Sequence, residues 1–378
     1  MIIKEASFKK LHGYIDIDVD FQDDVNIIIG GNGSGKTTIL NAMAWMLSPN
    51  YWWNDTPNAY FLANLEFEEV QVAYSHLNSD NQPAQRIITA TRNDEVVELN
   101  VSDIDDSLTI PIVQEGLGRP MMEDHIGSIV TSIRNQDQAH NQVLQHLQDL
   151  PGPLYLPLNR RWIEEPDNEV SFYRPRYRRP YMDAYAPAPI SQVLDRAERT
   201  FRQEKSKITD LQERLINWIT KESLDDARIS ELQSKVKEYE DNLAQIKNLS
   251  EKFLASVNSF FNDNKKELFV SQELELAVKV AEGLRVSARQ LSSGELQILM
   301  LFAFLYFQRD NPAGKQHQSD RIAVFLDEPE VSLHLAWQRR YVESITRANT
   351  DAQFIIATHS PEIAGPVEDS AIISIHPK

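Results

Sequence analysis

The stretch from residue 26 to residue 47 constrains the fold of this chain more than any other. Residues 26–29 (NIII) are a short apolar run that predicts a buried strand. Residues 30–37 (GGNGSGKT), the phosphate loop, follow at once and match the pattern G-x-x-x-x-G-K-[ST]. Residues 39–47 then carry apolar side chains at helical spacing. This order predicts a nucleotide-binding α/β domain. A chance match in a chain of 378 residues is expected only about once in a hundred such chains.

The glycines of the phosphate loop allow consecutive backbone N–H groups to turn inward around phosphate groups, because no Cβ atom is in the way. Lys36 is expected to supply the cation for the β- and γ-phosphates, and Thr37 the hydroxyl that binds Mg²⁺. The other residues expected to contact the nucleotide are Gly30, Asn32, Gly33, Ser34, Gly35 and Thr38. The alternative is a glycine-rich turn with an incidental lysine.

Two later apolar runs end in polar residues suited to catalysis. Residues 321–326 (RIAVFL) end at Asp327 and Glu328, and open α/β sheets place their chemistry at such strand ends. We expect Asp327 to hold Mg²⁺ through water and Glu328 to orient or deprotonate the attacking water. Residues 354–357 (FIIA) lead to His359, which is expected to contact the γ-phosphate or that water. The alternatives are an acidic strand end that starts a loop and a histidine with a purely structural role.

A fourth segment, residues 291–295 (LSSGE), precedes a strongly apolar run over residues 296–307. Ser292 or Ser293 can cap the helix that this run predicts, and Glu295 falls within its first turn. The exposed N–H groups of such a terminus form an anion site. The same letters fit an ordinary capped helix equally well.

These four segments, in this order and spacing, resemble the heads of ABC-type ATPases of the SMC and RecF-like group. In that comparison residues 291–295 are the signature turn. The resemblance implies an α/β fold, an ABC-type P-loop head with a mixed sheet and an antiparallel β-layer. It also implies an ATPase that uses ATP and Mg²⁺ and forms a head-to-tail homodimer. In such a dimer Ser292, Gly294 and Glu295 of one subunit would contact ATP bound at Lys36 of the other. The Q-loop glutamine has no clear match, and Gln114 and Asn159 are both candidates.

A narrower resemblance rests on residues 327–334 (DEPEVSLH) and 357–363 (ATHSPEI). These segments are similar to the OLD-type (overcoming-lysogenisation-defect) ATPases. They are also similar to AAA-family ATPases of bacterial phage-defence systems of the Septu, retron and PARIS-like kinds. OLD-type nucleases continue into a second, metal-binding domain, and no room remains for one before Lys378. We therefore expect a stand-alone ATPase that controls a separate effector protein.

The two halves of the predicted head lie at the two ends of the chain. Residues 1–160 would form the N-terminal half, with alternating segments in residues 65–110 that suit the antiparallel layer. Residues 266–378 would form the C-terminal half. Residues 161–265 would be an insertion whose later part has the apolar spacing of an antiparallel helical hairpin, with a turn near residues 221–226.

At 1.5 Å per residue, each arm of this hairpin is expected to be at most about 40 Å long. Its apolar seams are expected at positions 194, 197, 201, 208, 211, 215 and 218 of the first arm, and at 229, 232, 236, 239, 243, 246, 249 and 253 of the second. The hairpin is expected to present a partner-binding surface or to brace an oligomer above the dimer. A packing insert without either role is the alternative.

Three features of the sequence bear on binding partners, namely the net charge, one arginine-rich segment and the absence of long apolar runs. The formal net charge of −18 argues against a surface that binds nucleic acid everywhere, but residues 172–189 interleave tyrosines with Arg174, Arg176, Arg178 and Arg179. The Arg174–Arg179 region suits either nucleic acid or a docking protein. No cysteine is present, and no apolar run approaches the ~20 residues of a membrane span. A cytoplasmic location without membrane contact is expected.

Two functions therefore remain open. One is a defence-system ATPase that dimerises around ATP and controls an effector. The other is a RecF-like DNA-repair ATPase that binds DNA as an ATP-dependent dimer. DNA binding that needs ATP, falls steeply with salt and requires no second protein would favour the latter.

Overall fold

The computed structural model describes residues 1–49, 52–53, 56–77, 82–112, 122–150, 152–156, 190–220, 226–280, 283–307, 321–348 and 351–375. The α-helices are α1 Lys36–Leu47, α2 Asn58–Asn64, α3 Met122–Gln138, α4 Gln142–Asp149, α5 Ile190–Thr220, α6 Asp226–Phe261, α7 Ser293–Phe307, α8 Leu335–Ala348 and α9 Pro361–Ala364. The strands are β1 Ile2–Leu11, β2 Ile15–Asp20, β3 Val25–Gly30, β4 Trp52–Trp53, β5 Thr56–Pro57, β6 Glu69–Leu77, β7 Pro83–Arg92, β8 Val96–Val101, β9 Ser107–Pro111, β10 Leu154–Leu156, β11 Glu267–Val270, β12 Leu276–Lys279, β13 Arg285–Ser287, β14 Ile322–Asp327, β15 Ala352–Ala357 and β16 Ile372–Ile375.

A parallel sheet of order β10-β14-β15-β3-β16 brings the two ends of the chain together. Its central strands are apolar and buried along almost their whole length, as expected where both faces of a parallel sheet are covered. Asp327 pairs with Ala357, and Ala357 pairs with Ile28. The register therefore aligns the carboxyl ends of β14, β15 and β3 at one edge, where the polar residues predicted from the sequence follow.

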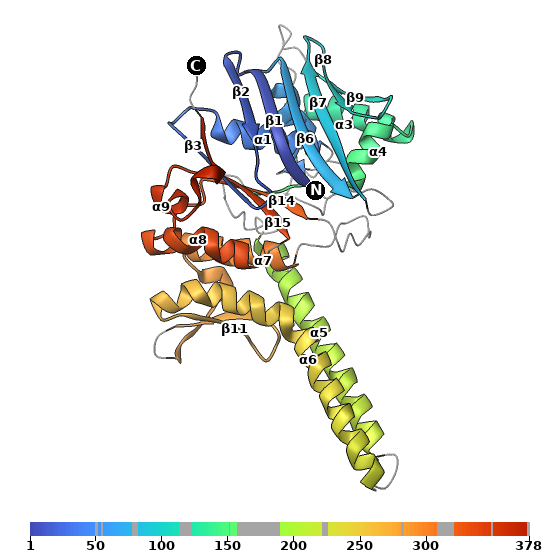
Figure 1. Cartoon of the computed structure of the whole chain (residues 1–378), viewed down its shortest axis with the longest axis vertical. Coiled ribbons are helices and arrows are strands. Elements are labelled where there is room, and N and C mark those ends of the chain that lie inside the picture. The colour runs from blue at the N-terminus through green and yellow to red at the C-terminus, as the bar shows by residue number, and fades with distance from the viewer. Residues whose placement is uncertain are drawn as a thin grey trace.

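A separate antiparallel sheet of order β2-β1-β6-β7-β8-β9 forms the second layer, at the top of Figure 1. The alternation noted in residues 65–110 becomes β6 to β9, and the first two strands of the chain complete the layer. Helix α1 lies between the two sheets, in one core that contains Phe8 and Val72 from this layer and Ile28 and Phe325 from the parallel sheet. The α/β class and the antiparallel layer expected of the head are confirmed.

The other face of the parallel sheet is covered by α7, α8 and the bases of α5 and α6 (Figure 1). Helix α7 is buried from Gly294 to Phe307, which explains why its sequence is apolar on every side. The small antiparallel sheet β11-β12-β13 closes this lobe beside α6. Residues 267–287, which precede the signature turn, are thereby attached to the head.

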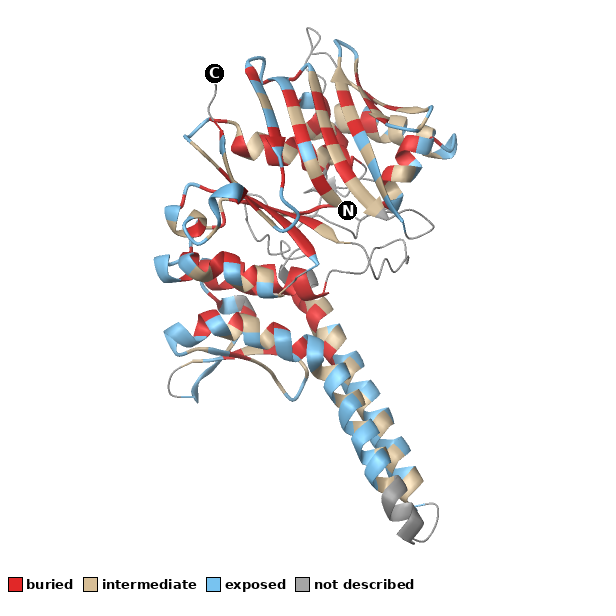
Figure 2. Cartoon of the chain, viewed as in Figure 1, coloured by how far each residue is buried: buried red, intermediate tan, exposed pale blue. Residues whose placement is uncertain are grey.

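The predicted hairpin is present as α5 and α6, which project from this lobe (Figure 1). Its base is buried, through residues such as Phe201 and Phe253, whereas the distal part is largely exposed (Figure 2). The helices have 31 and 36 residues, about 47 and 54 Å at 1.5 Å per residue, so the expected limit of about 40 Å was too short. Two predicted seam positions are also wrong, because Val236 is 36% and Leu249 is 37% exposed while Ser250 is buried.

Several expectations fall on residues outside the described part of the chain, namely Gln114, Asn159 and the Arg174–Arg179 region. The division of the chain at residues 160 and 265 stays a prediction. Among the described helices, none combines the length and the apolar character that a membrane crossing requires.

Candidate nucleotide site

The phosphate loop joins the end of β3 to the start of α1. Gly33 and Gly35 have φ of 76° and 94°, a left-handed conformation that side chains with a Cβ rarely adopt. A Cβ at Gly30 would lie 2.6 Å from Ser34 Oγ and 2.8 Å from the Ile375 carbonyl oxygen. No side chain caps the N-terminus of α1. Its first N–H groups therefore remain suited to phosphate oxygens.

The side chain of Lys36 is folded back over this loop. Its Nζ donates to the carbonyl oxygens of Gly30 and Gly31, at 3.0 and 3.2 Å, and lies 2.9 Å from Nε2 of His359. Burial lowers the pKa of Lys36, and the nearby carboxylates, Glu328 foremost, oppose that shift. The loop therefore holds a cation at the position where phosphate charge would bind.

Thr37 and Asp327 supply oxygen atoms beside that lysine. Thr37 Oγ1 donates to Asp327 Oδ1 at 3.1 Å, and Asp327 is fully buried at the end of β14. A hydroxyl and a carboxylate are the hard oxygen ligands that Mg²⁺ prefers beside a nucleotide. This donor set therefore fits a magnesium ion held by these two residues.

Glu328 and His359 approach each other from adjacent strand ends. Glu328 Oε1 lies 3.5 Å from His359 Nε2, and both side chains are partly exposed. The backbone of Glu328 has φ of 44°, and its N–H donates to the Ala357 carbonyl at 2.8 Å. A non-glycine residue in this conformation carries strain that the surrounding structure must maintain. Here the turn directs the carboxylate away from the sheet edge toward the histidine.

The structure adds two residues that the sequence did not single out. Glu330 accepts hydrogen bonds from Thr358 Oγ1 at 2.7 Å and from the His359 N–H at 2.6 Å. His12 lies with its Nε2 2.9 Å from Thr38 Oγ1. The second glutamate of the DEPE segment was the only sequence sign of Glu330, and it was used only as a family marker.

The signature turn is fixed by contacts of its own. The backbone N–H and Oγ of Ser292 donate to Glu295 Oε2 at 3.1 and 2.9 Å, and Lys266 Nζ donates to both Glu295 oxygens at 2.8 and 3.0 Å. Burial raises the pKa of Glu295, but the bonds from Lys266 and Ser292 outweigh it and lower the pKa. A Cβ at Gly294 would lie 2.3 Å from the Ser332 carbonyl oxygen. The turn is therefore packed on the loop after β14, with Glu295 buried and Ser292 exposed.

Five of the predicted site residues thus meet in one place: Lys36, Thr37, Asp327, Glu328 and His359. Together they offer a cation for phosphate, oxygen ligands for a metal, and a carboxylate with an imidazole for a water molecule. Ser292, Gly294 and Glu295 are held separately, at the start of α7. Their contact with a nucleotide in another subunit stays a prediction.

Comparison with curated proteins finds two retron ATPases. The "Retron Vc95 probable ATPase" of Vibrio cholerae serotype O1 biovar El Tor is 22% identical over 379 residues, which cover 93% of this chain and 68% of that protein. The "Retron Ec83 probable ATPase" of Escherichia coli is 26% identical over 188 residues, 44% of this chain and 33% of that protein. "Endonuclease GajA" of Bacillus cereus (strain VD045) is 30% identical over 86 residues, 22% of this chain and 14% of that protein. The chain thus spans about two thirds of the first relative and much less of the others.

Among solved structures, an Smc head bound to the C-winged helix domain of ScpA is 14% identical, with coverage of 99% and 94% and a TM-score of 0.49. The SMC head domain from Thermotoga maritima is 13% identical, with coverage of 97% and 93% and a TM-score of 0.44. The family model described as an AAA ATPase domain matches residues 1–364. Since that match spans nearly the whole chain and includes every residue of the site above, the chain belongs to the AAA ATPase domain family and is an ATPase, which hydrolyses ATP to ADP and phosphate.

Proposed function

We propose that this ATPase dimerises head to tail around ATP and uses its nucleotide state to control a separate effector protein in bacterial anti-phage defence. The observation that carries the proposal is the contact of Lys36 with His359, 2.9 Å apart. This contact joins the phosphate loop to the loop after β15, which carries His359. One subunit therefore holds a nearly complete hydrolytic site.

Each residue of that site has a role set by its chemistry. Lys36 and the first N–H groups of α1 bind the phosphates, and Thr37 with Asp327 would hold Mg²⁺. The metal, when bound, would neutralise charge on the phosphate oxygens. Glu328 orients the attacking water and takes its proton, and the neighbouring His359 contacts that water or the γ-phosphate. These residues need no further group from their own subunit.

The second subunit would supply the signature turn. Ser292 is exposed at the start of α7, where the N–H groups of the helix favour an anion. The Lys266–Glu295 ion pair fixes the shape of the turn, at 2.8 Å. Two large apolar residues nearby, Val331 and Leu335, are 43% and 56% exposed. Exposed apolar side chains on the face that also exposes Ser292 support a second copy of the chain as the partner at this face.

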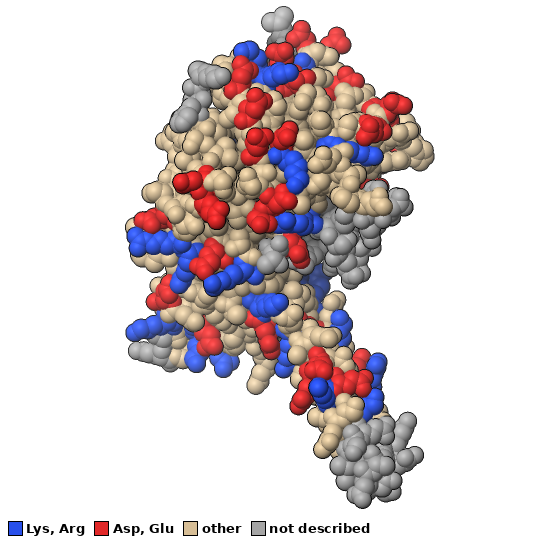
Figure 3. Space-filling view, in the orientation of Figure 1, with Lys and Arg blue, Asp and Glu red and all other residues tan. Residues whose placement is uncertain are grey.

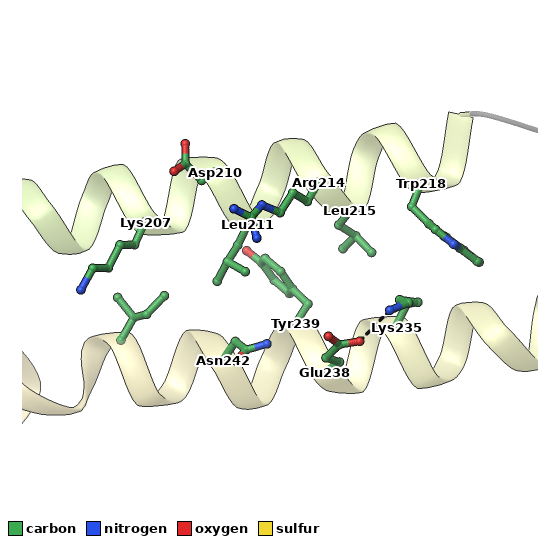
Figure 4. Close-up of a pocket in the computed structure, with 11 residues that line it drawn as sticks. Lys207, Asp210, Leu211, Arg214, Leu215, Trp218, Lys235, Glu238, Tyr239 and Asn242 are labelled. Atoms are coloured by element: carbon green, nitrogen blue, oxygen red, sulfur yellow. Dashed lines mark hydrogen bonds and ion pairs between the residues drawn. The ribbon is translucent and has the colours of Figure 1, made fainter.

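The effector is proposed from the relatives and from the hairpin. Two relatives are named as retron ATPases, and the distal hairpin contributes little to the core of the head (Figure 2). Between α5 and α6 lies a cavity of about 560 Å³ with Leu211, Leu215, Trp218 and Tyr239 among its lining residues (Figure 4). Ile216 nearby is 57% exposed. The lining also carries charged side chains of both signs. A surface that mixes aromatic, aliphatic and charged side chains in this way suits a protein partner.

The distribution of surface charges also favours a protein partner over a nucleic acid. Acidic and basic side chains are interspersed over the face of the molecule shown in Figure 3, whereas DNA-binding surfaces concentrate basic residues. We expect the affinity for the effector to depend on the bound nucleotide. An effector that binds the closed dimer and the open dimer with different affinities is coupled to the equilibrium between them, which ATP shifts.

The test compares wild type, Glu328→Gln and Lys36→Ala with the protein encoded beside this chain in its genome. We expect ATP to raise the molar mass of Glu328→Gln to that of a dimer and to change its affinity for the neighbouring protein, with neither change in Lys36→Ala. Replacing Arg174, Arg176, Arg178 and Arg179 by alanine should weaken docking more than ATP turnover.

An ATP-dependent, salt-sensitive affinity of the isolated chain for DNA, without any affinity for the neighbouring protein, would instead establish the RecF-like alternative. Metal-dependent cleavage of DNA by the pure chain would contradict the need for a separate effector.

A further inference from the structure

One carboxylate connects the loop after β14 to the loop after β15. Glu330 Oε2 accepts from Thr358 Oγ1 at 2.7 Å, and Glu330 Oε1 accepts from the His359 N–H at 2.6 Å. Thr358 is fully buried. Hydrogen bonds to a charged acceptor are stronger than neutral ones. The two oxygens therefore hold a side chain and the following amide together.

The backbone of Glu330 is itself held from the other side. Gln297 of α7 donates from Nε2 to the Pro329 carbonyl at 2.6 Å, and Gln338 of α8 donates to the Leu333 carbonyl at 2.8 Å. Both glutamines are buried, at 5% and 8% exposure. A shift of this loop would leave buried polar groups unsatisfied, which is costly. Glu330 is thus an anchored group rather than a mobile surface acid.

The residue after the histidine is anchored as well. Ser360 Oγ donates to Gln338 Oε1 at 2.6 Å and accepts from the first amides of α9. His359 therefore stands between two tethered neighbours while its own ring points into the site, 2.9 Å from Lys36 Nζ and 3.5 Å from Glu328 Oε1. With the backbone fixed on both sides, the ring has little freedom except rotation about its own bonds.

We propose that Glu330 is a positioning residue for ATP hydrolysis, which acts by holding the backbone of His359 so that the imidazole faces the reacting phosphate. The inference rests on the proposed role of His359. Glu330 does not touch the nucleotide and takes no part in proton transfer. Its loss would displace the ring, and displacements of about 1 Å cost about 10²-fold in rate.

The experiment measures kcat, KM for ATP and nucleotide affinity of the full chain. Glu330→Ala should lower kcat by about 10²-fold and leave nucleotide affinity nearly unchanged. Glu330→Gln should keep most of the activity, because its amide oxygen still accepts from the His359 N–H and its NH₂ group reaches Thr358 Oγ1. If Glu330→Gln is as impaired as Glu330→Ala, the charge is what matters and the inference is wrong.

A double-mutant cycle with His359→Ala separates positioning from general structural damage. We expect Glu330→Ala to have almost no further effect when His359 is already absent, because there is no ring left to position. If His359→Ala is impaired but the two effects multiply, the inference about Glu330 fails alone. If His359→Ala hydrolyses ATP normally, the proposed role of the histidine fails first.

Two controls address folding. Asn258→Ala removes a matched pair of hydrogen bonds, to the N–H and carbonyl of Leu268 at 2.6 and 2.9 Å, far along the chain from the site. It should lower Tm without lowering kcat of the folded protein. Thr358→Val removes one of the two bonds of Glu330 and also the bond that Thr358 Oγ1 accepts from the Ser360 N–H at 3.0 Å. It keeps the Glu330 bond to the His359 N–H, so it stays informative if Glu330→Ala does not fold. It should lower kcat by a smaller factor than Glu330→Ala does. In a chain that already carries His359→Ala, it should lower kcat no further. Multiplication of these two effects would overturn the inference.

Discussion

The ammonium group of Lys36 lies 2.9 Å from Nε2 of His359, although 323 residues separate them in sequence. A lysine ammonium group has only donors, so a hydrogen bond between the two groups needs Nε2 as the acceptor. A bound γ-phosphate would compete for the same donors of Lys36. Phosphate binding would therefore release the imidazole from the lysine and free Nε2 for the reacting groups.

Loss of Lys36 should weaken ATP binding strongly. In Lys36→Ala the phosphates lose a charge-assisted partner that contributes ~1.5–3 kcal/mol, so affinity should fall by at least about tenfold. Titration with a fluorescent ATP analogue measures the effect. Lys235→Ala, which removes a hairpin lysine paired with Glu238 at 2.8 Å, is the matched control and should bind normally. Equal affinity in Lys36→Ala would refute the site.

Loss of the carboxylate of Glu328 should stop hydrolysis without stopping binding. Glu328→Gln keeps the size of the side chain but cannot take a proton, so kcat should drop by about 10²–10⁴-fold. Steady-state turnover and nucleotide titration on the same preparation separate the two effects. Glu343→Gln removes an exposed acid of α8 that pairs with Arg347 and should leave turnover unchanged. Normal turnover in Glu328→Gln would contradict the assigned role.

A blocked signature turn should be complemented only in mixtures. Ser292→Arg would fill the place of the γ-phosphate of the opposite subunit, so this variant should bind nucleotide but not hydrolyse it. Mixed with Lys36→Ala, it should regain at most one working site per heterodimer, measured as turnover of the mixture above the sum of its parts. If Ser292→Arg dimerises and hydrolyses normally, the turn is only a helix cap.

The antiparallel layer should make the protein sensitive to acid through His146. Burial foremost, and then Arg86 and His76, lower the pKa of His146 to about 4, while Tyr74 and Arg86 lie within hydrogen-bond distance of its ring. In the unfolded chain the pKa is about 6.5. Below that pH the unfolded state binds a proton that the native state refuses until about pH 4, so the stability present above pH 6.5 is lost as pH falls through this window.

The loss should reach about 2–3 kcal/mol by pH 4.5, measured as the urea-unfolding free energy at pH 7 and at pH 4.5. His146→Gln keeps a polar partner for Tyr74 but does not titrate. It should therefore show a clearly smaller decline over the same range. Identical declines in the two proteins would show that His146 is not the sensitive group.

Local patterns in the sequence were enough for the phosphate loop, the strand ends at Asp327 and Ala357, and the helical hairpin. Each of these depends on residues close together in the chain. Glu330 was missed because its partners, Thr358 and His359, lie 28 and 29 residues further on. No spacing rule connects an acid to an amide on the next strand end.

Glu295 also shows that local patterns do not reveal contacts between distant residues. Its neighbours in the signature turn predict a role toward the nucleotide, but only the fold reveals that Lys266 holds it, 29 residues away. On α6, the spacing of apolar residues predicted that Leu249 belongs to the apolar seam of the hairpin. The structure instead turns Ser250 inward at the base of the hairpin, because the docking of α6 on the head sets its rotation there.

The place of β3 between β15 and β16 has a consequence for how the protein is made. The strand that carries the phosphate loop leaves the ribosome before both of its hydrogen-bonded neighbours, which come from residues 352–375. Until those residues emerge, β3 has two open edges and the pieces of the ATP site cannot meet. Such non-local pairing folds slowly and exposes apolar strands meanwhile. Nascent chains should therefore be inert toward ATP and dependent on chaperones until residues 352–375 have been made.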